Sequence, residues 1–282
     1  MWDGGKLLIA AIVVTGLFHK VTNLKLLDMA PDAVDDLYDG CRQEAMEKFI
    51  NSGLLGQELN ASAGFQQAWS ANNHCQKLIP GGTKDHTAAL LTYANADVGF
   101  IKTFDAAVET MGGNASTYEN HFHFKSLHFL LMDSMSLLNP KKCETLYFIH
   151  EGYSAPEGSK VRFGSFIKVH SSYTTLKELE DWDGQVIFNI TTCFFVHLGA
   201  DICSGDQDMA LISPTEVFTV QKVAKVSDSI NDSEYTVIVL NHSARNSTHN
   251  CYISSRSRAY VSTQWLVLVL VASSLFFFVE NK

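Results

Sequence analysis

Hydrophobic residues recur every three or four positions through most of the first half of the chain. The clearest case is Phe122 to Leu138, a run that stops before Asn139-Pro140. Proline cannot continue a helix because it lacks the backbone N–H, so this pattern predicts one helix with a sharp end. The same spacing predicts a helix over residues 33–52, and Asp85 is placed to cap a further one.

The second half has a different pattern, in which short runs of β-branched and aromatic residues predict strands. These runs are Thr145–His150, Lys160–Val169, Gln185–Phe195, Ala210–Val220 and Tyr235–Leu240. Helices that precede strands are typical of the α+β class. We therefore expect a helical N-terminal half beside a mainly antiparallel β core. One domain is predicted, over residues 23–253, because no repeat or low-complexity linker interrupts it.

The N-terminal end carries an apolar run outside this domain. Leu7 to Phe18 is twelve residues long, which is too short to span a bilayer and typical of the central region of a secretory signal peptide. We expect residues 1–22 to form that signal. A buried N-terminal helix is the alternative interpretation.

The C-terminal end carries a second apolar run, Trp265 to Val279, after a polar spacer with Ser254, Ser255 and Ser257. Small residues, a polar spacer and an apolar tail form the signal for a glycosylphosphatidylinositol (GPI) anchor. We expect residues 254–282 to be removed, and the protein to be held by the lipid at the extracellular face of the plasma membrane. A short membrane span is the alternative.

Composition narrows the class of partner. Apolar residues make up 46% and charged residues 18% of the 282 positions, as in an ordinary globular protein, and the formal net charge is −9. Nucleic-acid phosphates need a basic face, and the sequence has no basic run. The sequence therefore argues against a nucleic-acid partner.

An exported chain with an even number of cysteines favours disulfides, and the lack of any C-x-x-C pair gives a metal site no support. The cysteines are Cys41, Cys75, Cys143, Cys193, Cys203 and Cys251. Their spacing alone does not choose the pairing. Sequons of the form N-x-S/T agree with export and predict a glycosylated surface. They begin at Asn60, Asn114, Asn189, Asn231, Asn241 and Asn246.

Common catalytic signatures are missing from the sequence, which has no G-x-S-x-G elbow, no H-E-x-x-H and no Gly-rich phosphate loop. His121 and His123 fall in a segment predicted to be helical. Residues two apart point in different directions on a helix, so these two are not expected to share a metal. The stretch Asp206-Gln207-Asp208 precedes an apolar run and fits either a solvated turn or the edge of an active site.

Several short stretches resemble, in the expected order, the vertebrate ecto-ADP-ribosyltransferases, which are arginine-specific, NAD-dependent and usually lipid-anchored. The stretches are L-D-M-A-P-D-A-V-D-D-L-Y-D-G-C (27–41), D-H-T-A-A-L-L-T-Y (85–93), F-H-F-K-S-L-H-F-L-L (122–131), V-R-F-G-S-F (161–166), L-G-A-D-I (198–202), L-I-S-P-T-E-V-F (211–218) and S-T-H-N-C-Y (247–252). This resemblance covers nearly the whole mature chain and implies the ADP-ribosyltransferase fold. It also implies disulfides Cys41–Cys251 and Cys143–Cys193, which leaves Cys75 and Cys203 either paired or free.

The family's reaction breaks the bond between nicotinamide and ribose in NAD, so positive charge develops on the ribose. The resemblance implies that two glutamates of an E-x-E stretch act on this charge and on the incoming guanidinium. It implies further that an arginine after a tyrosine holds the dinucleotide and that a serine in an S-x-S stretch orients the site. An active member would use NAD and no metal.

Each of these positions departs from the family pattern here. The arginine position falls on Phe148 and the serine position on Lys168, while the E-x-E positions fall on Gln207 and Met209. Glutamine cannot act as a base, and methionine has neither charge nor a strong acceptor. Phe148 also removes the guanidinium that suits a pyrophosphate, which argues against NAD binding.

Asp206 and Asp208 form a D-x-D stretch one residue upstream of the expected register. A one-residue bulge would bring Asp208 into the place of a glutamate, although its side chain is shorter by about one methylene. The chain also inserts residues 194–197 relative to the family pattern. The favoured hypothesis is a non-catalytic surface protein that binds an extracellular protein partner. The alternative is an active transferase that modifies arginines of extracellular proteins through Asp206 or Asp208.

Overall fold

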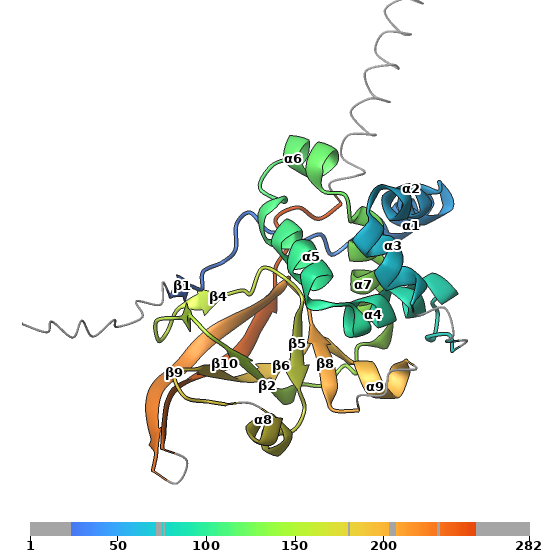
Figure 1. Cartoon of the computed structure of the whole chain (residues 1–282). Helices are drawn as coiled ribbons and strands as arrows, with labels where there is room; N and C mark the ends of the chain where they lie inside the picture. The colour runs from blue at the N-terminus through green and yellow to red at the C-terminus, as the bar shows by residue number, and fades with distance from the viewer. Residues whose placement is uncertain are drawn as a thin grey trace, which may run out of the picture.

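A computed structural model describes residues 24–71, 75, 77–179, 181–202, 207–229 and 232–251. Helices of the first half gather above a sheet that the second half builds (Figure 1). The α+β prediction is therefore confirmed. Some predicted features fall outside the described residues. These are the signal peptide (1–22), Asp206, Cys203, Asn231 and the anchor signal (254–282).

The helical layer comes from residues 42–138. Its elements are α1 (Arg42–Met46), the π-helix η1 (Glu47–Asn51), α2 (Leu54–Ala61), α3 (Ala63–Ser70), α4 (Lys84–Asn95), α5 (Val98–Thr110), α6 (Ala115–His121) and α7 (Lys125–Leu138). Helix α7 is the centre of the layer, because every residue from Ser126 to Met135 is buried. It ends before Asn139-Pro140, as the sequence predicts.

Two helix predictions need correction. The helix predicted over 33–52 begins only at Arg42, because the residues before it are not helical and bury Asp35 against the C-terminal segment. Helix α4 is capped by Thr83 and not by Asp85. Thr83 Oγ1 accepts a hydrogen bond from the N–H of Asp85 at 3.3 Å, and the N–H of Thr83 donates to His86 Nδ1 at 3.0 Å.

The placement of His121 and His123 on one helix was also wrong. His121 is the last residue of α6, and His123 lies between α6 and α7. In the described part of the chain, the one group of close potential metal ligands is Asp36 with Cys41 and Cys251. Those two cysteines are bonded to each other, so the group offers no thiolates.

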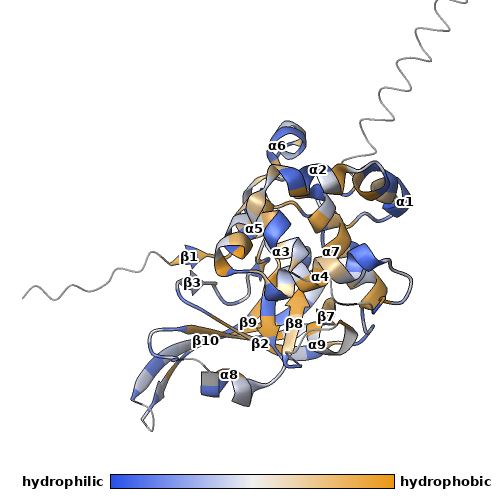
Figure 2. Ribbon diagram, turned by 45° about the vertical axis from the view of Figure 1, so that its right-hand side comes forward, coloured by the Kyte–Doolittle hydropathy of each residue, from blue (hydrophilic) through white to orange (hydrophobic). Residues whose placement is uncertain are grey.

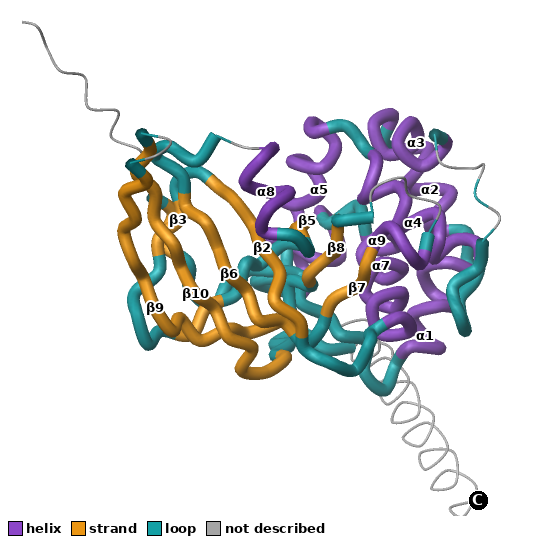
Figure 3. Tube along the Cα trace, turned by 90° about the horizontal axis from the view of Figure 1, so that it is seen from below, coloured by secondary structure: helices purple, strands orange, loops and turns teal. Residues whose placement is uncertain are grey.

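The main sheet has the strand order β4-β9-β10-β6-β2-β5-β8-β7, and every neighbouring pair is antiparallel except β10 with β6. Figure 3 shows the sheet beside the helical layer. The strands are β2 (Glu144–His150), β4 (Lys160–Val161), β5 (Ile167–His170), β6 (Val186–Thr192), β7 (Phe195–His197), β8 (Met209–Ile212), β9 (Glu216–Asp228) and β10 (Ser233–Arg245). A separate parallel pair joins β1 (Lys25–Leu26) to β3 (Tyr153–Ser154).

Two predicted strands are each divided in the structure. The run Ala210–Val220 becomes β8 and β9, which Pro214 separates, and Lys160–Val169 becomes β4 and β5. The short helices α8 (Tyr173–Leu179) and α9 (Leu198–Asp201) lie among the strands. A small buried cluster joins Leu176 of α8 and Trp182 after it to Ile187 of β6 and Tyr235 of β10.

The inserted residues 194–197 are part of the folded core. Phe194, Phe195 and Val196 are buried, and β7 pairs with β8 at the edge of the sheet. Phe194 and Val196 join the core that the helical layer shares with β8, where hydrophobic residues gather in Figure 2. The insertion therefore adds an edge strand and not a loose loop.

Disulfides Cys41–Cys251 and Cys143–Cys193 are present, which confirms the pairing implied by the family resemblance. Cys75 is also disulfide-bonded. Close to Cys41, Asp35 and Arg162 form a buried ion pair at 2.7 Å. Asp35 accepts further hydrogen bonds from the backbone and hydroxyl of Thr248 at 2.9 and 2.7 Å. Three of the family-like stretches thus meet at one buried carboxylate.

Candidate functional site

A cavity of about 740 Å³ lies between helix α5 and strands β2 and β5. We call it the α5 cleft. Strands β2 and β5 pair only at Tyr147 and His170, and beyond that point they separate and leave room for the cavity. Its volume falls within the range of about 300–1,000 Å³ that is typical of small-molecule sites.

Two of the residues that the resemblance singled out, Phe148 and Lys168, line the α5 cleft. Phe148 projects from β2, and its ring packs on Phe188 and against the edge of Phe163, each with centroids 5.8 Å apart. Lys168 comes from β5, and its Nζ lies 3.4 Å from the carbonyl oxygen of Ala94 and 5.9 Å from the centroid of the Tyr93 ring. Phe148 thus presents a hydrophobic ring to this part of the cleft.

The E-x-E positions lie at the start of β8, opposite the end of β5. Met209 pairs with His170 and packs against the helical core. Gln207 is exposed, with its Nε2 3.4 Å from the carbonyl oxygen of Gly199. Neither side chain lines the α5 cleft, and neither supplies a carboxylate.

Asp208 is engaged in local structure. Its Oδ2 lies 3.0 Å from Nδ1 of His170, and its Oδ1 accepts a hydrogen bond from the N–H of Ser172 at 2.8 Å. The backbone oxygen of Asp208 accepts from the N–H of Ser171 at 2.8 Å. The carboxylate therefore holds the segment that leads into α8. Asp208 itself does not line the α5 cleft, whereas its partner His170 does.

The structure adds acidic residues that the sequence did not single out. Helix α5 presents Asp105 and Glu109 to the α5 cleft, one turn apart on the same face. Burial raises the pKa of Asp105 to about 7; the hydrogen bond from Tyr93 opposes this rise, and Glu109 adds to it. Glu109 is held by Lys25 at 2.6 Å and by the Ser165 hydroxyl at 3.2 Å. The i, i+4 spacing was visible in the sequence, but exposed helix faces carry the same pattern.

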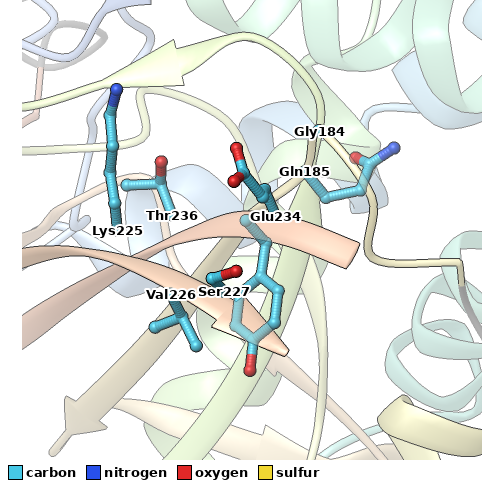
Figure 4. A pocket seen from close by; sticks show the side chains of 8 residues that line it. Gly184, Gln185, Lys225, Val226, Ser227, Glu234 and Thr236 are labelled. Carbon is cyan, nitrogen blue, oxygen red and sulfur yellow. The ribbon is translucent and has the colours of Figure 1, made fainter. Parts of the chain in front are cut away.

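A second hollow lies on the β9–β10 hairpin, far along the sheet from these positions. Its volume is about 300 Å³, and Lys225, Glu234 and Thr236 are among the side chains that line it (Figure 4). None of the positions implied by the family resemblance contributes to it. We therefore take the α5 cleft as the candidate site.

The sequons are distributed over both layers. Asn60 lies in the last turn of α2, and Asn114 caps α6. Asn241 lies in β10 and Asn246 follows it. All four asparagines are exposed. Asn189 is half-buried within β6. None of these asparagines lines the α5 cleft.

Comparison with known proteins agrees with the fold. The family model for NAD:arginine ADP-ribosyltransferase matches residues 27–248, and the chain belongs to this family. It is similar to mouse ecto-ADP-ribosyltransferase 5, at 32% identity over 69% of this chain and 66% of the relative, so the match spans about two thirds of that protein. It is 28% identical to mouse GPI-linked NAD(P)(+)–arginine ADP-ribosyltransferase 1 over 85% of this chain and 77% of that relative.

Solved structures give the same result. The crystal structure of the eukaryotic mono-ADP-ribosyltransferase ART2.2 superimposes with a TM-score of 0.64 and 27% identity, covering 80% of this chain and 98% of that one. A variant of ART2.2 was solved in complex with NAD, and it matches equally well. Within the described residues, no helix is long and apolar enough to cross a bilayer.

Proposed function

We propose that this protein is a non-catalytic, cell-surface member of the ADP-ribosyltransferase family, whose cleft binds a ligand without transferring ADP-ribose. The observation that carries the proposal is Phe148. It occupies the family's arginine position and packs its ring into an aromatic cluster with Phe163 and Phe188. A side chain built into the core in this way contributes no donor to a phosphate.

The remaining family positions support the proposal. Lys168 stands in place of the serine, and neither Gln207 nor Met209 can stabilise the cation that forms on ribose. Asp105 and Glu109 place carboxylates on the α5 wall of the cleft, where the phosphates of a dinucleotide would add like charge. The residues present therefore do not fit NAD.

A second candidate function, arginine-specific transfer that uses Asp208, has one observation in its favour. Asp208 is next to the E-x-E positions, and its partner His170 reaches the α5 cleft. Against it, the carboxylate already bonds His170 and the N–H of Ser172, so it would have to leave both to act on a substrate.

We expect the glycosylated ectodomain, residues 24–254, to show no saturable binding of NAD up to millimolar concentrations. We also expect no transfer of labelled ADP-ribose to agmatine above the enzyme-free background. The checks are calorimetric titration and a turnover assay on one sample, with the mouse GPI-linked relative as the positive control. Transfer at the rate of that control would overturn the proposal. Transfer that disappears in Asp208→Asn would establish the second candidate.

A GPI anchor at the cell surface is part of the same proposal, and the apolar C-terminal run after a small, polar spacer supports it. Phosphatidylinositol-specific phospholipase C is expected to release the protein from cells that express the full chain, as judged by antibody staining. Retention on the treated cells, while a known GPI-anchored marker is released, would favour the membrane span instead.

A further inference from the structure

The α5 cleft carries opposite charges around one tyrosine. The hydroxyl oxygen of Tyr93 lies 3.1 Å from Asp105 Oδ1 and 2.7 Å from the carbonyl oxygen of Phe166, two acceptors that share its single hydrogen. Lys168, on the β5 side, holds its Nζ 5.9 Å from the centroid of the same ring. A carboxylate and an ammonium therefore face the cavity within a few ångströms of Tyr93, one from each wall.

Asp105 is the acid of the cleft whose negative charge is least balanced by hydrogen-bond donors and cations. Glu109 is bound by Lys25 and Ser165, whereas Asp105 has the Tyr93 hydroxyl as its hydrogen-bond partner, and Lys168 acts on its charge through space. A cationic group bound beside Asp105 would supply the missing charge, and it would favour the ionised carboxylate.

The rest of the cleft combines apolar and polar surface. Phe148 and Ile101 line it beside Lys102, His150 and Ser165. Phe148 is half-buried: its ring stacks on Phe188, and its remaining exposed surface is what a ligand ring can pack against. The volume of about 740 Å³ leaves room for an apolar body beside an ammonium and a carboxylate.

We propose that the α5 cleft binds a small zwitterion of the aromatic α-amino acid type, with its ammonium at Asp105, its carboxylate at Lys168 and its ring against Phe148. This inference rests on the proposed function, because it assigns the cleft of a non-catalytic member to a ligand without phosphates. Lys102 and Glu109 lie one turn of α5 before and after Asp105 and also line the cleft, where Glu109 is paired with Lys25.

The first test is a calorimetric comparison of three probes on the ectodomain, residues 24–254. L-Tryptophan carries both charges, L-tryptophanamide lacks the carboxylate, and indole-3-propionate lacks the ammonium. L-Tryptophan is expected to bind saturably, and each analogue about tenfold more weakly. Absence of saturable L-tryptophan binding, or equal affinity for all three probes, would overturn the proposal.

Two substitutions then assign each charge. Asp105→Asn keeps an acceptor for Tyr93 and is expected to weaken L-tryptophan and the amide about tenfold while leaving indole-3-propionate unchanged. Lys168→Met is expected to weaken L-tryptophan and indole-3-propionate while leaving the amide unchanged. Glu178→Gln, an exposed acid on α8, is the control and should change none of the affinities. If Asp105→Asn weakens all three probes equally, the ammonium site is disproved.

The pH dependence of tryptamine gives an independent readout, because this probe has no carboxylate and its alkylammonium group stays charged from pH 6 to pH 8. Its affinity should fall from pH 8 to pH 6, because Asp105 takes up a proton near pH 7. The other titratable or charged groups that face this carboxylate are Tyr93 on α4, Lys102 and Glu109 on α5, His150 and Tyr153 near β2, and Lys168 and His170 on β5. Tryptamine has no carboxylate for charged histidines to attract. A flat tryptamine profile would contradict the assignment.

Failure of this ligand assignment can be distinguished from failure of the proposed function. Transfer of ADP-ribose to agmatine would overturn the non-catalytic function whatever the tryptophan series shows. If the affinities of L-tryptophan and its analogues do not differ with charge, and transfer is also absent, only the ligand assignment is overturned.

Discussion

Replacing both Cys41 and Cys251 by serine is expected to lower the free energy of unfolding by about 5 kcal/mol, because the bond closes a loop with a sequence separation of 210 residues. The unfolded chain gains most when its longest loop is opened. Urea denaturation of the ectodomain, followed by tryptophan fluorescence, measures the change. The bond also holds Cys251 beside α1, which no other covalent link does within the described residues.

The matched comparison is the double replacement of Cys143 and Cys193, whose separation is 50 residues. The same chain-entropy argument gives about 4 kcal/mol, a smaller loss. A loss below about 1 kcal/mol for the Cys41–Cys251 variant would contradict the prediction and would mean that the unfolded chain is already constrained.

Asp35→Ala is expected to destabilise the ectodomain by about 3–5 kcal/mol, because it leaves the buried guanidinium of Arg162 without its counter-ion. Both side chains are almost completely inaccessible, at 0% and 1% exposure. Burial alone would raise the pKa of Asp35, but hydrogen bonds from the Thr248 backbone and from Arg162 hold it below its usual value. Since the folded pKa is lowered, this stabilisation is present at neutral pH and is lost as pH falls below about 4.

Asp39→Ala is the control for that experiment, because Asp39 is an exposed acid of the same segment. Its loss of stability should stay within about 0.5 kcal/mol. The double variant Asp35→Leu with Arg162→Met should lose less than the sum of the two single variants, since no charge is left buried. Additive losses measured by urea denaturation would show that the two groups do not act as a pair.

The fold was predictable because hydrophobic periodicity is a local signal of each element, and because the family-like stretches include residues that hold the fold together. Periodicity predicted α7 and its end at Pro140, and β-branched runs predicted the strands, although Pro214 divides one of them. The stretches that resemble the family also bear on stability. Buried Asp35 binds buried Arg162 and accepts hydrogen bonds from Thr248, and Glu216 is buried, with its carboxylate accepting hydrogen bonds from Thr192 and Cys193. Such residues persist as long as the fold does, whatever the chemistry of the cleft.

The candidate site was predictable only in part. The resemblance singled out Phe148 and Lys168, and both line the cleft, but their assignment to the family's arginine and serine positions stays a prediction. Asp208 was a candidate for catalysis, but the contact that occupies it, His170, is 38 residues away in sequence. Asp105 and Glu109 were not predicted, because two acids one turn apart usually mark a solvated helix face. That face of α5 lines the cleft only because α5 packs over β2 and β5.

If the proposed C-terminal anchor is present, the position of the Cys41–Cys251 bond has a mechanical consequence. Tension that enters the domain from beyond residue 251 reaches the disulfide first and passes into α1 and the helical layer. Strand β10, which hydrogen-bonds to both β9 and β6, lies behind that point and does not carry the load. With the bond intact, a pull on the tether moves the domain as one body. With the bond reduced, the same pull would peel β10 from the centre of the sheet, one residue pair at a time.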